Sequence, residues 1–121
     1  CQKQDTYIFL FGAIMTIREA SRQFHITEHE IETYEAKGFI EKSGDEYCDG
    51  DFRHLTTLRL LLNAGMGDGE IVRYLSLLDR EGTQQAQIAI LRTFRAKLLD
   101  RLHERQQALD HIDYIIYQIK K

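Results

Sequence analysis

The residues from 80 to the end carry one helical pattern, and this pattern constrains the fold more than any other feature. After a polar hinge at Gly82–Gln85, apolar residues recur at three- and four-residue spacing, interrupted by Arg105. Some thirty helical residues at about 1.5 Å each make a rod of roughly 50 Å. A small domain upstream cannot cover so long an apolar stripe, so we expect an antiparallel coiled-coil homodimer. The predicted dimerisation residues are Ile88, Leu91, Phe94, Leu98, Leu102, Leu109, Ile112, Ile116 and Ile119.

Two short helices are predicted near the start of the chain. Thr16-Ile17-Arg18-Glu19 has the form of a capping box and predicts a helix over 17–23. Thr27-Glu28-His29-Glu30 repeats this form, and Gly38 is placed to end the second helix. Two capped helices separated by three or four residues are typical of a helix-turn-helix.

Three further elements are expected between Gly38 and the hinge. The polar segment Glu41–Glu46, between Phe39-Ile40 and Tyr47, predicts a short hairpin that would form a wing. A third helix is expected to start near Asp49–Asp51, whose carboxylates suit a helix N-terminus, and to run to Ala64. A fourth opens at Gly67-Asp68-Gly69-Glu70 and carries Ile71, Tyr74, Leu75 and Leu78.

Length and composition favour a small cytoplasmic protein. The 121 residues allow one ordinary domain, or a small domain with an appended helix. Cys1 and Cys48 form neither metal-ligand spacing nor a disulfide framework, which fits a reducing compartment. The apolar run Tyr7–Met15 is too short to span a bilayer, and no small-residue cleavage site follows it, so we expect residues 1–14 to form an arm or strand and no membrane to be a partner.

The segment from residue 15 to 79 resembles the opening of MerR-family transcriptional regulators. The similarity lies in Met15-Thr16-Ile17-Arg18-Glu19-Ala20 and in Ile31 to Ile40, where Tyr34, Glu35 and Gly38 match the family pattern. Tyr47, Asp51, Leu58 and Ala64-Gly65-Met66 follow in step, and the long C-terminal helix fits in position and length. The resemblance implies a mostly α fold: four helices with a short hairpin wing over 15–79, then the dimerisation helix over 80–121.

The resemblance also implies a homodimer that binds double-stranded DNA at a pseudo-palindromic promoter. The second helix would enter the major groove, with support from the first helix, the wing and the third helix. RNA polymerase or another protein remains a further candidate partner. The DNA-binding residues that the resemblance implies are Arg18, Arg22, Gln23, Thr27, His29, Thr33, Tyr34, Lys37, Lys42 and Arg53.

Three departures from the family pattern favour an alternative function. Glu32-Thr33 stands where the family has Arg-Tyr, the wing is several residues short, and His25 occupies the usual turn glycine. Residues 1–79 contain 14 acidic and 8 basic side chains, whereas residues 80–121 contain 5 and 8, giving −6 and +3. A nucleic-acid binder concentrates positive charge where it meets phosphate. The alternative is therefore a MerR-shaped adaptor that binds another protein.

Other functions find less support in the sequence. No nucleophile with a base, phosphate-binding glycine loop or metal cluster is recognisable, so we expect neither enzymatic activity nor a cofactor or metal. His103 and His111 are interpreted as surface histidines of the long helix. Cys48 is considered as a redox-sensing thiol, and Tyr114 and Tyr117 as part of a hydrophobic terminus that packs on the partner or borders an effector pocket.

Overall fold

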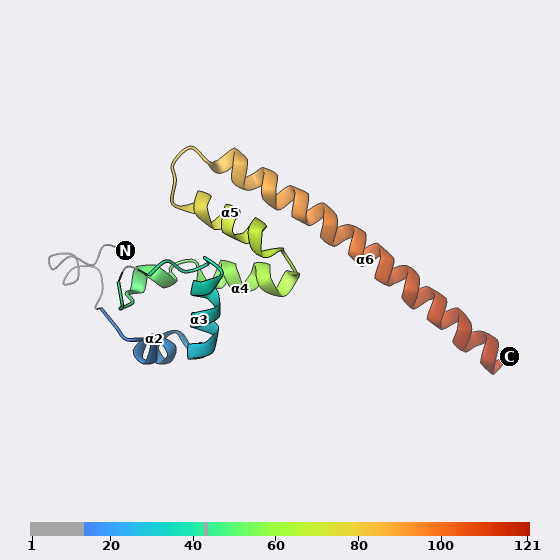
Figure 1. Ribbon diagram of the computed structural model, residues 1–121. Helices are drawn as coiled ribbons and strands as arrows, with labels where there is room; N and C mark the ends of the chain where they lie inside the picture. The colour runs from blue at the N-terminus through green and yellow to red at the C-terminus, as the bar shows by residue number, and fades with distance from the viewer. Residues whose placement is uncertain (1–13, 43) are drawn as a thin grey trace. The chain divides into compact units, whose positions relative to one another are not determined.

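The chain is mostly helical, as predicted, in a computed structural model that describes residues 14–42 and 44–121. It divides into two compact units between Asp79 and Arg80, here called the head (the described residues up to 79) and the tail (80–121). The expected arm over residues 1–14 lies outside the described residues except for Ile14. The elements are α2 (Ile17–Phe24), α3 (Glu28–Ala36), the 3-10 helix η1 (Asp49–Phe52), α4 (Leu55–Ala64), α5 (Asp68–Leu78) and α6 (Gln84–Lys120) (Figure 1).

Helices α2 and α3 form the predicted helix-turn-helix. The Thr16 hydroxyl accepts from the Glu19 backbone N–H at 3.2 Å, and the Glu19 carboxylate accepts from the Thr16 backbone N–H at 3.1 Å, which completes the capping box. The turn passes through His25, which takes the left-handed conformation with φ 54° and ψ 49°. Because the tight turn needs this conformation, the residue that stands where the family has glycine adopts the glycine-like backbone.

Gly38 follows the end of helix α3 as predicted, but the cap at the start of the helix is simpler than the predicted capping box. The Thr27 hydroxyl accepts from the Glu30 backbone N–H at 3.0 Å, but the Glu30 carboxylate accepts from the Tyr34 hydroxyl, so the second capping box is only half formed. At the other end, Gly38 has φ 82°, and the Phe39 N–H donates to the Tyr34 carbonyl at 2.8 Å. The Tyr34 and Phe39 rings lie 6.1 Å apart, which adds the hydrophobic contact of a Schellman motif.

The predicted hairpin wing is wrong for the part of the chain that the structure describes. Around residue 43, which is not described, the backbone from Phe39 to Tyr47 forms bends and a turn without strand pairing to itself. Tyr47 pairs instead with Met15 in an isolated antiparallel bridge, with N–H to O distances of 2.7 and 2.8 Å. The segment is short and polar, so burying Tyr47 against the start of α2 leaves too few residues for a two-stranded ladder.

The predicted third helix is divided in two. The buried Asp51 carboxylate accepts from the Cys48 backbone N–H at 2.9 Å, which favours the tight 3-10 turn of η1. The Phe52 ring stacks on Phe24 with ring centroids 4.5 Å apart and lies 5.8 Å from the Tyr47 ring. Burial of Phe52 turns the chain at Arg53 and His54, and the α-helix α4 begins only at Leu55.

Cys48 also departs from expectation. It is 2% exposed and disulfide-bonded, so neither the exposed, redox-sensing thiol nor the absence of a disulfide holds. The cysteine argument for a reducing compartment is thereby removed, and the cytoplasmic location stays a prediction from the other sequence features. None of the helices in residues 14–42 and 44–121 has the length and hydropathy of a membrane span.

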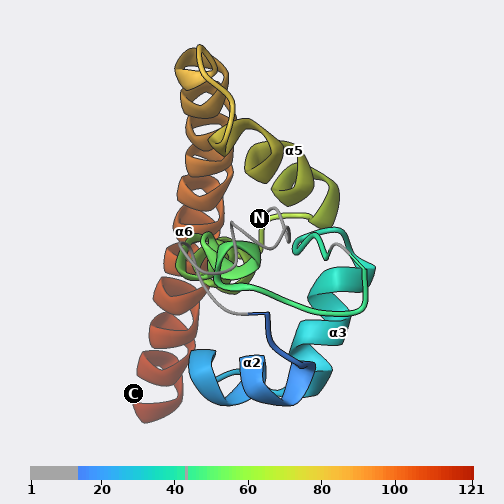
Figure 2. The same cartoon turned by 90° about the vertical axis from the view of Figure 1, so that its left-hand side faces the viewer.

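The core of the head lies around α2 and α3. Ala20 and Ile31 are completely buried, and they face Met15, Ile26, Ile40, Tyr47 and Phe52, with Ile17, Phe24, Tyr34 and Leu55 packed around them. Beyond this cluster, α4 packs against α5, with Leu58 and Ile71 buried, and Gly65 (φ 89°) ends α4. Figure 2 shows α2 and α3 side by side, with α4 and α5 continuing the head.

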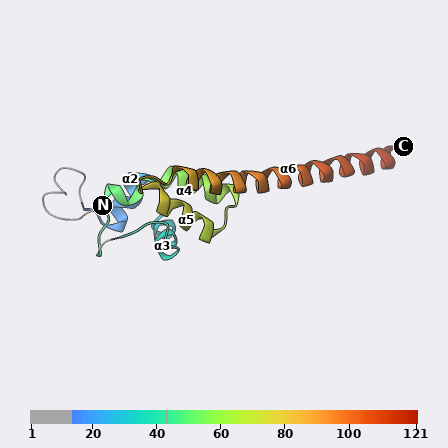
Figure 3. The same ribbon diagram turned by 90° about the horizontal axis from the view of Figure 1, so that it is seen from above.

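The tail is a single helix of 37 residues, α6, which at about 1.5 Å per residue is roughly 55 Å long (Figure 3). Thr83 precedes it, and its hydroxyl donates to the Arg80 carbonyl at 2.8 Å and accepts from the Gln87 amide at 3.0 Å. Phe94 is 5% exposed and Leu98 is half-buried. The C-terminal half differs, because Leu102, Leu109, Ile112, Ile116 and Ile119 are all exposed, from 46% to 79%.

His25→Gly is expected to stabilise the head by about 0.5–1 kcal/mol, since a residue with a Cβ is strained in the left-handed region and glycine is not. Urea unfolding at fixed protein concentration measures the change. Lys37→Gly is the matched control. Because Lys37 has φ −87°, a conformation without strain for a residue with a Cβ, glycine relieves no strain there and this variant should be less stable than the wild type. A loss of stability in His25→Gly would show that the imidazole contributes more than its backbone strain costs.

Candidate nucleic-acid interface

Helices α2 and α3 carry most of the predicted DNA-binding residues on the outside of the head. Seven of the ten are exposed and three are half-buried. The exposed ones come from three places: the surface of α2, the two ends of α3 and its first turn, and the turn before α4. The exposed set is Arg18, Arg22, Gln23, Thr27, His29, Lys37 and Arg53, and the half-buried set is Thr33, Tyr34 and Lys42.

Three of the predicted cations are paired inside the head. The Lys37 ammonium lies 3.3 Å from the Asp68 carboxylate, and the Lys42 ammonium lies 3.6 Å from Glu35 and 4.9 Å from the centre of the Tyr47 ring. Arg53 is paired with Asp79. Exposed ion pairs contribute about 0–1 kcal/mol, so a phosphate could displace the carboxylate from Lys37 at small cost.

Arg18 and Arg22 form no ion pair within residues 14–42 and 44–121. Both side chains are exposed on α2, one turn apart, so they project from the same side of the helix. Gln23, next to them, donates from its amide to the Asp49 carboxylate at 2.9 Å and so ties α2 to η1. Among the predicted residues, the two arginines are therefore the cations most available to an anion.

Several polar side chains of α3 are used within the head. The Tyr34 hydroxyl donates to Glu30 at 3.3 Å, Arg59 of α4 lies 3.8 Å from the same carboxylate, and burial together with Glu30 raises the pKa of Tyr34. The Thr33 hydroxyl donates to the His29 carbonyl one turn back at 2.9 Å. The hydroxyls of Tyr34 and Thr33 are thus already hydrogen-bonded within the head, and Tyr34 helps to hold α3 in place.

Glu35 is a supporting residue that the sequence did not indicate. Its carboxylate accepts from the Tyr47 hydroxyl at 2.5 Å and pairs with Lys42. Burial, followed by the effect of Glu35, raises the pKa of Tyr47, so this hydroxyl stays protonated. The contact joins residues 12 positions apart across the segment expected to form the wing, and no local sequence pattern signals a contact of that kind.

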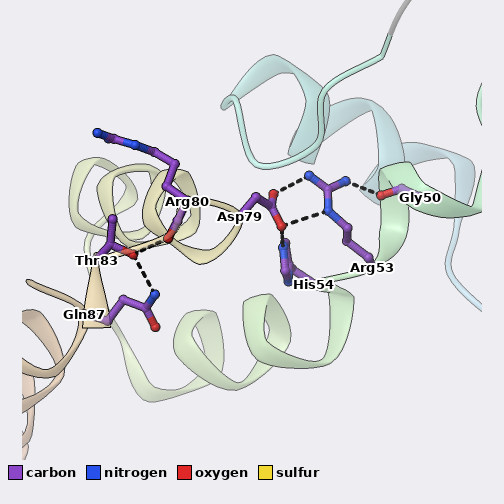
Figure 4. Close-up of polar contacts among 7 residues, drawn as sticks. All are labelled: Gly50, Arg53, His54, Asp79, Arg80, Thr83 and Gln87. Atoms are coloured by element: carbon purple, nitrogen blue, oxygen red, sulfur yellow. Dashed lines mark hydrogen bonds and ion pairs between the residues drawn. The ribbon is translucent and has the colours of Figure 1, made fainter. Parts of the chain in front are cut away.

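Arg53, His54 and Asp79 form a second polar cluster, drawn in Figure 4. Arg53 donates two hydrogen bonds to the Asp79 carboxylate and one to the Gly50 carbonyl, and the His54 Nε2 lies 2.9 Å from Asp79. The Arg53 guanidinium lowers the pKa of Asp79 to about 2, with a smaller contribution from His54. Arg53 therefore joins the end of α5 to the turn before α4, and DNA would have to compete with Asp79 for it.

A cavity of about 250 Å³ adjoins this cluster, between the Gly38–Glu41 segment, η1, α4 and α5. Its walls are both apolar, from Phe39, Leu58 and Leu75, and charged, from Arg53 and Asp79. The described residues hold no group of three His, Cys, Asp or Glu side chains placed to bind a metal ion. His103 and His111 are exposed on α6.

Asp79→Asn should remove a pH-dependent part of the stability of the head. Because the folded-state pKa of Asp79 is lowered to about 2, its contribution is complete above the unfolded-state value near 4 and is lost as the pH falls through 2. The free energy of unfolding of Asp79→Asn should thus be lower than that of the wild type at pH 6, and the gap should close towards pH 2. Asp68→Asn, which removes one single contact to Lys37, is the control; an equal pH-dependent gap there would contradict the assignment.

No model of a known family and no curated protein matches the chain. Solved structures do. A protein from Listeria monocytogenes assigned to the MerR family of transcriptional regulators is 29% identical over 84% of this chain and 83% of its own, with a TM-score of 0.66. A MerR family regulator from Bacillus thuringiensis is 20% identical over 87% and 98%, with a TM-score of 0.62. HiNmlR, a MerR family regulator lacking the sensor domain and bound to promoter DNA, is 18% identical over 85% and 87%, with a TM-score of 0.62.

Each similarity covers more than four fifths of the chain, so each includes residues of both the head and the tail. The two matches at 20% and 18% identity show a common fold, and the match at 29% adds similarity of sequence. The resemblance inferred from the sequence is therefore confirmed, and the chain has the fold of MerR-family transcriptional regulators.

Proposed function

We propose that the protein is a DNA-binding transcriptional regulator that acts as a homodimer on a pseudo-palindromic promoter. The observation that carries the proposal is the α2–α3 helix-turn-helix, with two arginines exposed on α2, in a fold shared with a regulator whose structure holds promoter DNA. In helix-turn-helix proteins the second helix enters the major groove, and the first crosses the backbone. Here α3 would meet base edges while Arg18 and Arg22 meet phosphates.

The proposed dimer rests on the exposed apolar stripe of α6. Leu102, Leu109 and Ile116 repeat every seven residues, and Ile112 and Ile119 follow three residues after the last two. This is the a and d pattern of a coiled coil. Leaving five such side chains in water forgoes about 1.5–3 kcal/mol each, so pairing with a second copy is favoured. An antiparallel pair would hold two heads apart and match the two-fold symmetry of a palindromic site.

The acidic character of α3 favours the second candidate, an adaptor that binds another protein, RNA polymerase among them. Glu28 and Glu32 are exposed on α3 and form no ion pair with the described residues. Carboxylates near phosphate are repelled. In this second function the chain would keep the fold of a regulator, and α3 would contact another protein.

Leu109→Asp should dissociate the dimer. An unpaired carboxylate in the apolar seam costs several kcal/mol, so the dissociation constant should rise by at least a hundredfold. Gln107→Asp is the control, because residue 107 lies on the opposite side of the helix from residue 109. Sedimentation equilibrium measures the mass against the 14.2 kDa of one chain. A wild-type chain that is monomeric at micromolar concentration would contradict the dimer.

Arg18→Ala combined with Arg22→Ala should weaken DNA binding on all sequences alike. Removing each phosphate-binding side chain should reduce the slope of log affinity against log salt by about 1. The measurement is fluorescence anisotropy on duplexes from upstream of the protein's own coding region, at several salt concentrations. Arg101→Ala, exposed in the tail, is the control and should leave the slope unchanged. Wild-type protein that binds no duplex at low salt would favour the adaptor.

A further inference from the structure

Arg53 is the predicted DNA-binding cation with the strongest contacts inside the head. Its Nε donates to one oxygen of the Asp79 carboxylate at 3.2 Å, one terminal nitrogen donates to the other oxygen, and the second terminal nitrogen donates to the Gly50 carbonyl (Figure 4). Such paired hydrogen bonds between a guanidinium and a carboxylate are among the strong polar contacts of proteins. The ammonium groups of Lys37 and Lys42 approach their carboxylates at 3.3 and 3.6 Å as single point charges. Releasing Arg53 therefore costs more than releasing either lysine.

Arg53 nevertheless lies at the surface, beside the helix that carries the two exposed arginines. The side chains of Arg53 and Asp79 are each 46% exposed, so a phosphate can reach the guanidinium. Phe52, the residue before Arg53, stacks on Phe24 at the end of α2, and Arg22 lies two positions before Phe24 on that helix. The turn that carries Arg53 is thus packed against the end of α2 that carries Arg22.

Asp79 occupies a place where a carboxylate does not stabilise its own helix. It is the C-cap residue of α5, and the C-terminal end of a helix carries a partial negative charge that repels an anion. Its contacts with the Arg53 guanidinium and with the His54 Nε2, 2.9 Å away, offset this repulsion. Asp79 is therefore placed to hold Arg53 and not to stabilise the end of α5.

The charges around Arg53 oppose an approaching phosphate. Asp79, and more weakly Asp51 and Glu41, raise the pKa of Arg53, although burial lowers it. A phosphate that reached the guanidinium would also meet the negative charge of Asp79, so the two anions compete for the same donors. His54 contacts Asp79 as well, and this contact leaves the carboxylate with a partner when Arg53 is withdrawn.

We infer that Asp79 is an autoinhibitory residue: its carboxylate occupies Arg53 in the free protein, and a DNA phosphate must displace it before the guanidinium contributes to binding. The inference rests on the proposed DNA-binding function and adds a regulated contact to it. Arg18 and Arg22 form no ion pair among the described residues and meet phosphate without this competition. Arg53 adds affinity only on a duplex that places a phosphate where it can take over the bonds to Asp79.

Two simpler roles of Asp79 lead to different expectations. A purely structural contact predicts that Asp79→Asn lowers the stability of the head and leaves the DNA affinity of the folded protein unchanged. Plain repulsion between Asp79 and DNA predicts tighter binding by Asp79→Asn whether or not Arg53 is present. Autoinhibition predicts tighter binding only when Arg53 is present, so a double-mutant cycle separates the three explanations.

The test is fluorescence anisotropy of the full-length protein at pH 7 and fixed salt, on duplexes from upstream of its own coding region. Asp79→Asn should bind about three- to tenfold more tightly than the wild type, the range expected when one competing ion pair is removed. In an Arg53→Ala background the same substitution should change the affinity by less than about twofold. Glu46→Gln, which removes an exposed carboxylate of the head, is the matched control and should bind as the wild type does.

A spectroscopic measurement on the wild type keeps the inference testable if Asp79→Asn does not fold, which circular dichroism at pH 7 checks. The Arg53 Nε–H group gives a side-chain NMR signal, which is assigned by its absence from the spectrum of Arg53→Lys. Saturating duplex should shift this signal, because phosphate replaces the Asp79 carboxylate as the acceptor. A signal that stays in place would overturn the inference.

The remaining outcomes separate the inference from the proposed function. A folded Asp79→Asn that binds no more tightly than the wild type, or that gains as much affinity in the Arg53→Ala background, would overturn autoinhibition and leave the DNA-binding function standing. Wild-type protein that binds no duplex at low salt would overturn both.

Discussion

The packing of α2 on α3 around Ala20 and Ile31 is the constraint on which the head depends. Both residues are fully buried, and the helices can meet there only because the chain reverses within the short turn at His25. The exposed arginines of α2 and the exposed glutamates of α3 thus belong to one module, and the contacts of Glu35 with Tyr47 and Lys42 hold the segment after α3 against it.

Much of this arrangement could be predicted because it depends on local sequence patterns. The capping box at Thr16, the glycine stop at Gly38 and the heptad spacing of the tail each depend on residues within one or two turns of helix. His25 stands where the family has a turn glycine, which requires either a left-handed residue or an altered turn, and the structure has the left-handed residue. The wing and the third helix failed for a different reason: Tyr47 and Phe52 satisfy contacts with Met15 and Phe24, distant in sequence, and these contacts override local turn and helix preferences.

The sequence could indicate less about the candidate site than about the fold. The sequence identifies which residues are charged but not which charges are already paired. Arg53 and Lys37 are predicted DNA-binding residues, and both have carboxylate partners, Asp79 just after α5 and Asp68 at its start. The pairing of Arg53 with Asp79, 26 residues later, leaves no trace in spacing or composition. What the structure adds is a distinction between the charged side chains that have an ion-pair partner in the head and those, such as Arg18 and Arg22, that have none among the described residues.

Arg105 interrupts the apolar stripe of the tail and would affect how two copies of α6 align in the proposed dimer. Two helices that pair through an entirely apolar seam can shift by one heptad and still bury their leucines. Such a dimer would have no single register. Arg105 occupies a seam position between Leu102 and Leu109, and only a register that gives its guanidinium an outlet to water or an acceptor avoids a buried charge. In the proposed dimer, Arg105 would therefore limit the registers in which two tails can pair, as a polar residue at a seam position does in a coiled coil.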